Sequence, residues 1–260
     1  MKYYFLAILL FFPFYHAYAW TLNPNTQKGF KNNEIKIFIA NTTCSGAGFS
    51  TSRYVDLIKN AVEDYWNKVP TSALFLKVEG IKDDIDITGD THSSALNKVP
   101  ANTIVAGCNA SATDFDDSSI LGSAAMQCSG NTCRAILILN AHSSSKLPQK
   151  SDREIEAVIA HEIGHAFGLG HSEYQQSLMY YNTSGKYQKW LGDDDIDGVT
   201  YLYPHESKFD LLGQSLLGNC GAIAATDNLQ QQSFFDYYSS LALGVVFVFF
   251  IYFIRRKLKG

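Results

Sequence analysis

The sequence has little of what would assign it to several common classes. None of its five cysteines forms a CxxC pair, no internal repeat is visible, and only 18% of its 260 residues are charged. Zinc sites built on cysteine use closely spaced pairs, so such a site is not expected here. A formal net charge of -4 without a basic stripe also gives no indication of a nucleic-acid partner. We expect one folded domain between two apolar ends, and a monomer.

The first nineteen residues have the pattern of a secretory signal. Lys2 gives the positive start, residues 5–14 form an apolar run, and Ala17-Tyr18-Ala19 provides a small-x-small cleavage pattern before Trp20. The alternative is an anchor that is never cleaved, but the run is short for a membrane span. We therefore expect residues 1–19 to be a signal peptide and the rest of the chain to be exported.

A second apolar segment lies near the other end. Residues 237–254 carry no charge and as a helix would extend about 27 Å, enough for a thin bilayer. The basic residues Arg255, Arg256, Lys257 and Lys259 follow directly, which favours a short cytoplasmic tail over 255–260. The sequence thus predicts a stalk over 205–236, a transmembrane helix over 237–254 and a cell-surface or periplasmic body. A buried soluble helix, a bacterial sorting signal, or a secreted form with this helix removed are the alternatives.

Export changes the meaning of the cysteines, because disulfides form in oxidising compartments. Cys128 and Cys133 flank Ser-Gly-Asn-Thr, a turn composition that can join two strands, so we predict that they pair. Cys44 with Cys108 follows by elimination. Cys220 is left over, outside the expected catalytic domain.

The central region alternates between strand and helix patterns, which predicts an α/β fold. The expected helices cover 53–69, a segment beginning at Ser151, where Ser151 and Glu154 form a capping box, and 193–203. The expected strands are 34–40, 73–78, 84–88, 103–107, 122–127 and 134–139.

Residues 161–171 read HEIGHAFGLGH and carry the strongest chemical signal. On a helix, residues four apart share a face, so His161 and His165 can present two imidazoles to one metal ion. Gly168 permits a sharp turn that returns His171 as a third ligand. Three imidazoles leave one position open, as in catalytic zinc sites, and Glu162 is placed to act as general base. Three solvated or core histidines without metal are the alternative; chance would produce the whole pattern in on the order of one chain in a hundred thousand.

This pattern, HExxHxxGxxH, resembles that of the metzincin metallopeptidases, and among them the matrixins. Ser172 after the third histidine, Ser177-Leu178-Met179-Tyr180 at the position of the Met-turn, and Leu191 to Val199 all look matrixin-like. The resemblance implies a twisted, mostly parallel five-stranded mixed sheet, an active-site helix beneath it and a C-terminal helix. It also implies that Met179 forms an apolar floor under the zinc and that residues 122–127 are an antiparallel edge strand beside the substrate. The domain would cover 20–204.

The sequence departs from the matrixin pattern in three respects. No cysteine-switch motif occurs, and residues 20–34 are too few for the usual propeptide. Tyr181 stands where matrixins have proline; astacins and serralysins place a tyrosine there, which implies a catalytic role for Tyr181, with a wall of the substrate pocket as the alternative. No structural zinc site is recognisable: His92 and His142 are isolated and expected at the surface.

Two acidic clusters raise the question of a second metal ion. Calcium ligands are available at Asp83, Asp84, Asp86 and Asp90, or at Asp114, Asp116 and Asp117. Neither cluster has EF-hand spacing, so solvated acidic turns are the preferred reading.

The sequence as a whole predicts a zinc-dependent endopeptidase that acts on proteins or peptides. Two rivals remain open: an anchored binding or adhesion module that holds zinc without turnover, and a zinc hydrolase of cell-wall peptides. The retained Glu162 argues against the first rival, and the motif does not distinguish the second.

Overall fold

A five-stranded sheet organises the described part of the chain, which in this computed structural model comprises residues 20–205 without 43, 111–114, 116 and 183–189. The strand order is β2-β1-β3-β5-β4, and only β4 is antiparallel to its neighbour. The strands are β1 (Glu34–Ala40), β2 (Phe75–Lys82), β3 (Thr103–Asn109), β4 (Gly122–Ser129) and β5 (Thr132–Asn140). The predicted fold class is therefore confirmed, and so is the antiparallel edge strand.

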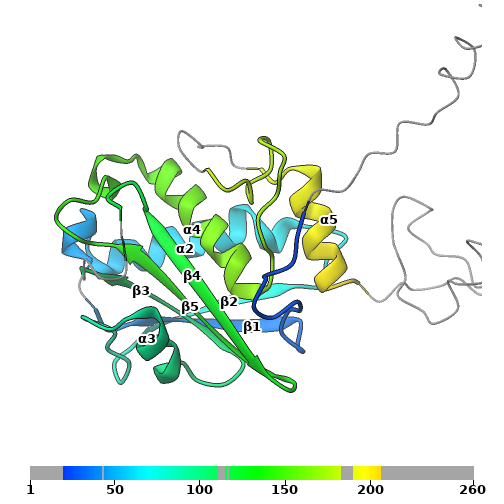
Figure 1. The fold of residues 1–260 in the computed structure, drawn as a ribbon, viewed down its shortest axis with the longest axis horizontal. Helices are drawn as coiled ribbons and strands as arrows, with labels where there is room; N and C mark the ends of the chain where they lie inside the picture. The colour runs from blue at the N-terminus through cyan, green and yellow to red at the C-terminus, as the bar shows by residue number, and fades with distance from the viewer. Residues whose placement is uncertain (1–19, 43, 111–114, 116, 183–189, 206–260) are drawn as a thin grey trace, which may run out of the picture. The chain divides into compact units, whose positions relative to one another are not determined.

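Helices cover both faces of the sheet, as expected for parallel strands. Figure 1 shows α2 (Thr51–Asp64) and α4 (Asp152–Phe167) on one face and α3 (His92–Lys98) on the other. Strand β5 alternates accordingly: Leu137 faces the large core with α2 and α4, while Ile136 and Ile138 face a second, smaller core with α3. The C-terminal helix α5 (Asp193–Leu202) completes the described elements, with short 3-10 turns η1 (Ser45–Ala47), η2 (Trp66–Lys68) and η3 (Leu147–Gln149).

The predicted helix over 53–69 is shorter than expected and begins earlier. Ser50 caps α2 by accepting a hydrogen bond from the Arg53 backbone N–H at 3.2 Å. The helix ends at Asp64, and Trp66 continues in η2. The reason is tertiary: the Trp66 indole is fully buried and donates to the Ala160 carbonyl of α4 at 2.8 Å.

The predicted strand over 84–88 is wrong. Its alternating isoleucines, Ile85 and Ile87, are buried in the second core, but the segment forms no strand. The place beside β1 is already taken, because β2 lies on one side of β1 and β3 on the other. The short helix α3, capped by Thr91, was not expected and covers these isoleucines.

Both expected disulfides are present in the structure. Cys44 is bonded to Cys108 and Cys128 to Cys133, the latter pair lying opposite each other on β4 and β5. Within the described residues no helix is long and apolar enough to cross a membrane. The predicted signal peptide, Cys220, the stalk from residue 206, the transmembrane segment 237–254 and the basic tail 255–260 all lie outside those residues.

Candidate active site and metal centre

Helix α4 carries the first two histidines of the motif. Its N-terminus has the expected capping box between Ser151 and Glu154, which fixes where the helix begins. It ends at Phe167, and the C-cap residue Gly168 has a φ of 126°, in the region that side chains rarely adopt. A Cβ there would lie 2.7 Å from the Lys28 carbonyl oxygen, so the turn that returns His171 needs glycine.

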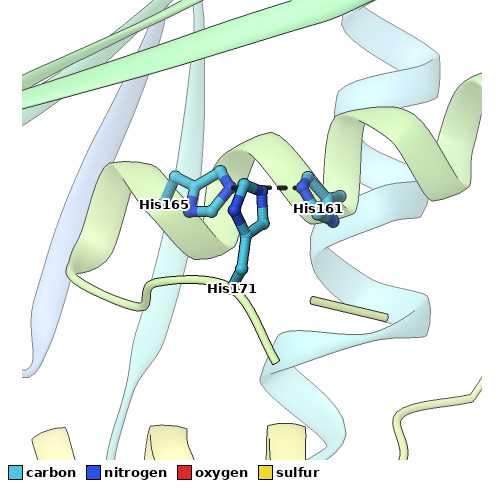
Figure 2. A group of neighbouring side chains, drawn as sticks. All are labelled: His161, His165 and His171. Atoms are coloured by element: carbon cyan, nitrogen blue, oxygen red, sulfur yellow. Dashed lines mark hydrogen bonds between the residues drawn. The ribbon is translucent and has the colours of Figure 1, made fainter. Parts of the chain in front are cut away.

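The three imidazoles converge through their Nε2 atoms, as Figure 2 shows. Nε2 of His165 lies 3.1 Å from Nε2 of His161 and 3.2 Å from Nε2 of His171. Nδ1 of His161 contacts the Leu178 carbonyl at 2.7 Å, and Nδ1 of His165 contacts the Leu169 carbonyl at 2.9 Å. A carbonyl only accepts hydrogen bonds, so each Nδ1 carries the proton and each Nε2 presents a lone pair.

This arrangement fits a zinc ion. Lone pairs on neutral imidazoles at about 3 Å repel one another unless a cation lies between them, and a carbonyl on Nδ1 is the usual support of a metal-ligating histidine. Burial lowers the pKa of His165 to about 4 and also lowers the pKa of His171. Both histidines therefore stay neutral, which is the form that binds metal. Within the described residues, only these three form a group of three or more potential metal ligands.

Glu162 lies in the same cleft as the histidines. Its side chain is 8% exposed, and burial raises its pKa to about 8, although a hydrogen bond from the Ala124 backbone of β4 acts in the opposite direction. A carboxyl whose pKa lies near neutrality can both take and give a proton, which suits a general base that later acts as an acid. The edge strand thus places a donor against the carboxylate.

A cleft of about 740 Å³ runs between the edge strand and the histidines. Gly122, Ser123 and Ala124 of β4 line one side, and four residues of α4 line its floor: Val158, His161, Glu162 and His165. Asn23, Pro24 and Asn25 line the end near the C-terminus of α4, where the Asn23 amide donates to the His165 carbonyl. Lys146 and Lys150 line the end near its N-terminus, just before the N-cap Ser151. These five residues at the two ends of the cleft were not identified from the sequence, because no local pattern connects them with the histidine motif.

The segment after His171 is fastened to α5 by Asp195. This carboxylate, 1% exposed, accepts hydrogen bonds from the backbone N–H groups of Leu178 (2.6 Å) and Met179 (2.9 Å) and from Gly192 (2.8 Å). The Leu178 carbonyl accepts from His161, and the Met179 N–H of the same peptide group donates to Asp195. Helix α5 therefore supports the candidate ligand His161 through this peptide group. The triple aspartate 193–195 signals a helix N-terminus, but only the tertiary contacts identify which carboxylate has this role.

Met179 lies beneath the histidine-bearing helix and is buried. A Cβ at Gly164 would come within 2.3 Å of its sulfur and 3.0 Å of Trp66, so the glycine between the two histidines admits the methionine. Tyr181 lines the cleft, is 65% exposed and packs its ring 4.4 Å from that of Tyr180.

The N-terminal segment holds the third histidine in place. Leu22 forms an antiparallel bridge with Leu169, and the Gly170 N–H donates to the Thr21 carbonyl at 2.7 Å. The Thr21 hydroxyl donates to the His171 carbonyl at 2.8 Å, and the Asn23 amide to that of His165 at 3.3 Å. Residues more than 140 positions away in the chain therefore order the loop that carries His171.

Four of the acidic residues considered for calcium, Asp83 not among them, have other partners. Asp84 pairs with Lys82 at 2.9 Å, Asp90 pairs with Lys98, and the Asp86 carboxylate accepts from the Thr88 backbone N–H at 2.8 Å. Of the second cluster, Asp117 accepts from the Ser119 N–H at 2.7 Å, while Asp114 and Asp116 lie outside the described residues. The two other histidines considered, His92 and His142, are both partly exposed and lie apart from the site.

A mixed five-stranded sheet with an antiparallel edge strand, an active-site helix with two histidines, a third histidine after a glycine turn and a methionine turn beneath them define the metzincin class of metallopeptidase domain. Comparison with known proteins makes the assignment narrower. The model of the matrixin family matches residues 29–204, and the chain belongs to this family.

Individual relatives match over a shorter stretch. Metalloendoproteinase 2-MMP of Arabidopsis thaliana is 45% identical over 58 residues, covering 22% of this chain and 15% of the relative. Metalloendoproteinase 5-MMP of the same plant is 42% identical over 69 residues, covering 26% and 19%. Matrix metalloproteinase-19 of Mus musculus is 46% identical over 55 residues, covering 20% and 10%. The chain thus matches less than a fifth of the length of each of these three relatives.

Proposed function

We propose that the chain is a zinc-dependent endopeptidase, with His161, His165 and His171 as the metal ligands and Glu162 as the general base. The observation that carries this proposal is the convergence of three imidazole Nε2 atoms beside a buried carboxylate in one cleft. Membership of the matrixin family and the metalloendoproteinase names of the relatives support it.

Each part of the site has a task in peptide hydrolysis. Zinc, when bound, supplies a Lewis acid that polarises the peptide carbonyl and makes water acidic enough to lose a proton near neutral pH. Glu162 accepts that proton and later donates it to the leaving amine. The outer edge of β4 offers backbone groups with which an extended peptide can pair as an added strand, and so fixes the peptide across the cleft. Leu178, Leu169 and Asp195 keep the ligands oriented.

The test uses the full chain and a Glu162→Ala variant, with Glu63→Ala on the exposed side of α2 as the control. Bound zinc per chain and cleavage of unfolded casein are measured, with and without a chelator. We expect one zinc in all three proteins, and a loss of about 10²- to 10⁴-fold in turnover for Glu162→Ala alone. Zinc without cleavage by the unmodified chain would instead favour a binding module, and a folded chain without zinc would contradict the proposal.

We further propose that the Tyr181 hydroxyl donates a hydrogen bond to the carbonyl oxygen of the reacting peptide bond, on which negative charge develops in the transition state. Its place in the cleft lining and its exposure support this role. Tyr181→Phe should lower kcat by about 10-fold or more with little change in KM, because the interaction forms only in the transition state. Unchanged turnover would leave Tyr181 as a wall of the pocket.

We also propose that the catalytic domain over 20–204 is exported behind a signal peptide over 1–19. A stalk over 205–236, a helix over 237–254 and a cytoplasmic tail over 255–260 would then anchor it to the membrane. Two disulfides within the domain support export, since they persist in oxidising compartments. When a protease is added outside intact cells, we expect a tag at residue 260 to be protected and the catalytic domain to be cleaved. Accessibility of both ends would contradict the anchor.

A further inference from the structure

The two ends of the cleft differ in charge. Apart from Glu162 and the three histidines, the ionisable side chains among the described residues that line it are Lys146, Lys150 and Tyr181, and both lysines lie at the end near the start of α4. The opposite end is lined by Asn23, Pro24 and Asn25, which are uncharged. We propose that Lys146 is a specificity-determining residue that selects peptides with an acidic side chain on the C-terminal side of the cleaved bond. This inference rests on the proposed peptidase function.

The segment 146–150, here called the rim of the cleft, carries both lysines, and its backbone is held by hydrogen bonds. Leu147, which is fully buried, anchors η3 between them, and the Lys150 N–H donates to its carbonyl at 3.0 Å. The Lys146 N–H donates to the Ser118 carbonyl at 3.3 Å and so ties the rim to the segment that leads into β4. The backbone positions of both lysines are therefore fixed. A ligand would need to order only their side chains.

The two lysines are not equally available. The ammonium of Lys150 is bound to Glu154 at 2.9 Å, and Glu154 belongs to the capping box of α4. Lys146 is exposed and attracts the nearby Asp117 carboxylate, but no short ion pair joins them; the close hydrogen bond of Asp117, at 2.7 Å, comes from the Ser119 N–H. A substrate carboxylate would thus meet the charge of Lys146 without displacing a short ion pair.

The direction of the peptide follows from the edge strand. The first residue of β4, Gly122, continues from the segment bound to Lys146, whereas Met126 further along contacts Thr26 near the other end of the cleft. An antiparallel peptide runs the opposite way, and antiparallel pairing is slightly the more stable arrangement. Its C-terminal part then lies at the lysine end.

The pairing of the peptide with β4 indicates which peptide residue can reach Lys146. Ala124 faces the general base, so the bond to be cleaved lies near this residue. Gly122 and Ile120 come two and four residues earlier in the chain, and Ile120 lines the cleft near the Lys146 rim. A paired strand advances by about 3.3 Å per residue on both sides, so the acidic side chain belongs roughly at the second to fourth residue after the cleaved bond.

The experiment measures a ratio within one protein. The zinc-loaded full chain cleaves a mixture of two peptides that differ only by Glu or Gln at one of these positions, at low salt. We expect kcat/KM to favour the Glu peptide by about two- to fivefold, the range for one exposed ion pair. The preference should fall towards one at about 1 M salt, where the screening length is about 3 Å.

Lys146→Glu should reverse the preference, and Lys146→Ala should remove it. The control is Lys77→Glu on β2, at the opposite edge of the sheet, which should keep the ratio of the unmodified chain. If the unmodified chain cleaves the Gln peptide but shows no preference, or a preference that Lys146→Glu does not change, the inference fails while the proposed function stands. If neither peptide is cleaved at any position, the proposed function itself fails.

Discussion

At the scale of single residues, Gly164 shows how one missing side chain positions the site. It lies between the two histidines of α4, at a place where Met179 packs against the helix. Glycine is a poor helix former, costing about 1 kcal/mol relative to alanine, so its presence needs a compensating reason. The reason is space, since the sulfur of Met179 occupies the position of the absent methyl group.

Gly164→Ala should therefore destabilise the domain in spite of its better helix propensity. The added methyl group would lie 2.3 Å from the sulfur, and overpacking of this kind costs about 1–3 kcal/mol, which outweighs the gain of about 1 kcal/mol. Urea unfolding and zinc affinity measure the effect. Arg153→Ala, on the exposed side of the same helix, is the control and should change stability by less than about 0.5 kcal/mol. A more stable Gly164→Ala protein would contradict the packing argument.

At the scale of elements, the active-site helix depends on its capping box. Hydrogen bonds from Lys150 and then Ser151 lower the pKa of Glu154 to about 2, from an ordinary value of 4.5. The folded state therefore favours the ionised carboxyl, and its contribution is present above about pH 4.5 and lost as the pH falls towards 2. This part of the site was predictable from the sequence, because a capping box joins residues only three positions apart.

The Glu154→Ala variant should be less stable than the unmodified chain by about 1 kcal/mol at pH 7. This difference should shrink as the pH is lowered from about 4.5 to about 2, where the carboxyl of the folded chain becomes protonated. Urea unfolding of the metal-free chain is the appropriate measurement, because acid also releases metal from histidines. The exposed Glu173→Ala serves as the control. A difference that grows in acid would contradict the assignment.

The metal-binding loop depends on a distant element. Thr21→Val removes the hydroxyl that donates to the His171 carbonyl, a bond worth about 1 kcal/mol. Zinc affinity should fall by about fivefold in competition with a coloured chelator, with unchanged stability elsewhere. Thr71→Val, whose hydroxyl contacts Thr200 away from the site, should bind zinc normally. Equal zinc affinity in the two variants would show that the N-terminal segment does not order the loop.

At the scale of the whole molecule, the two disulfides close loops of very different length. Cys44 and Cys108 are 64 residues apart and join the η1 region to β3, whereas Cys128 and Cys133 are only 5 apart within one hairpin. Cross-linking restricts the unfolded chain more when the loop is longer. The Cys44–Cys108 bond should therefore contribute more to the free energy of unfolding than the Cys128–Cys133 bond.

Replacing Cys44 and Cys108 by alanine should cost about 4 kcal/mol, and replacing Cys128 and Cys133 about 2 kcal/mol, from loop-closure entropy. Urea unfolding of both double variants beside the unmodified chain provides the comparison. An equal or larger loss for the hairpin pair would mean that native packing, and not loop length, decides the contribution.

The sequence by itself determined the parts of this protein that depend on neighbours in the chain. The histidines at 161 and 165, the glycine turn and the capping box follow from spacings of a few residues, and the structure places them as expected. The antiparallel edge strand was implied by the resemblance to the matrixins, and it is also present. Such contacts form wherever the local backbone adopts helix or strand, so their pattern is readable without the fold.

Tertiary structure alone decided which distant residues join the site. Asp195, Thr21, Asn23 and Lys146 reach the cleft or its supports through contacts that no short spacing encodes. The same reason explains the wrong strand over 84–88, whose alternating pattern is correct for burial but whose neighbouring position was already filled by β2 and β3. A strand needs an available partner, and availability is a property of the assembled sheet and not of the segment.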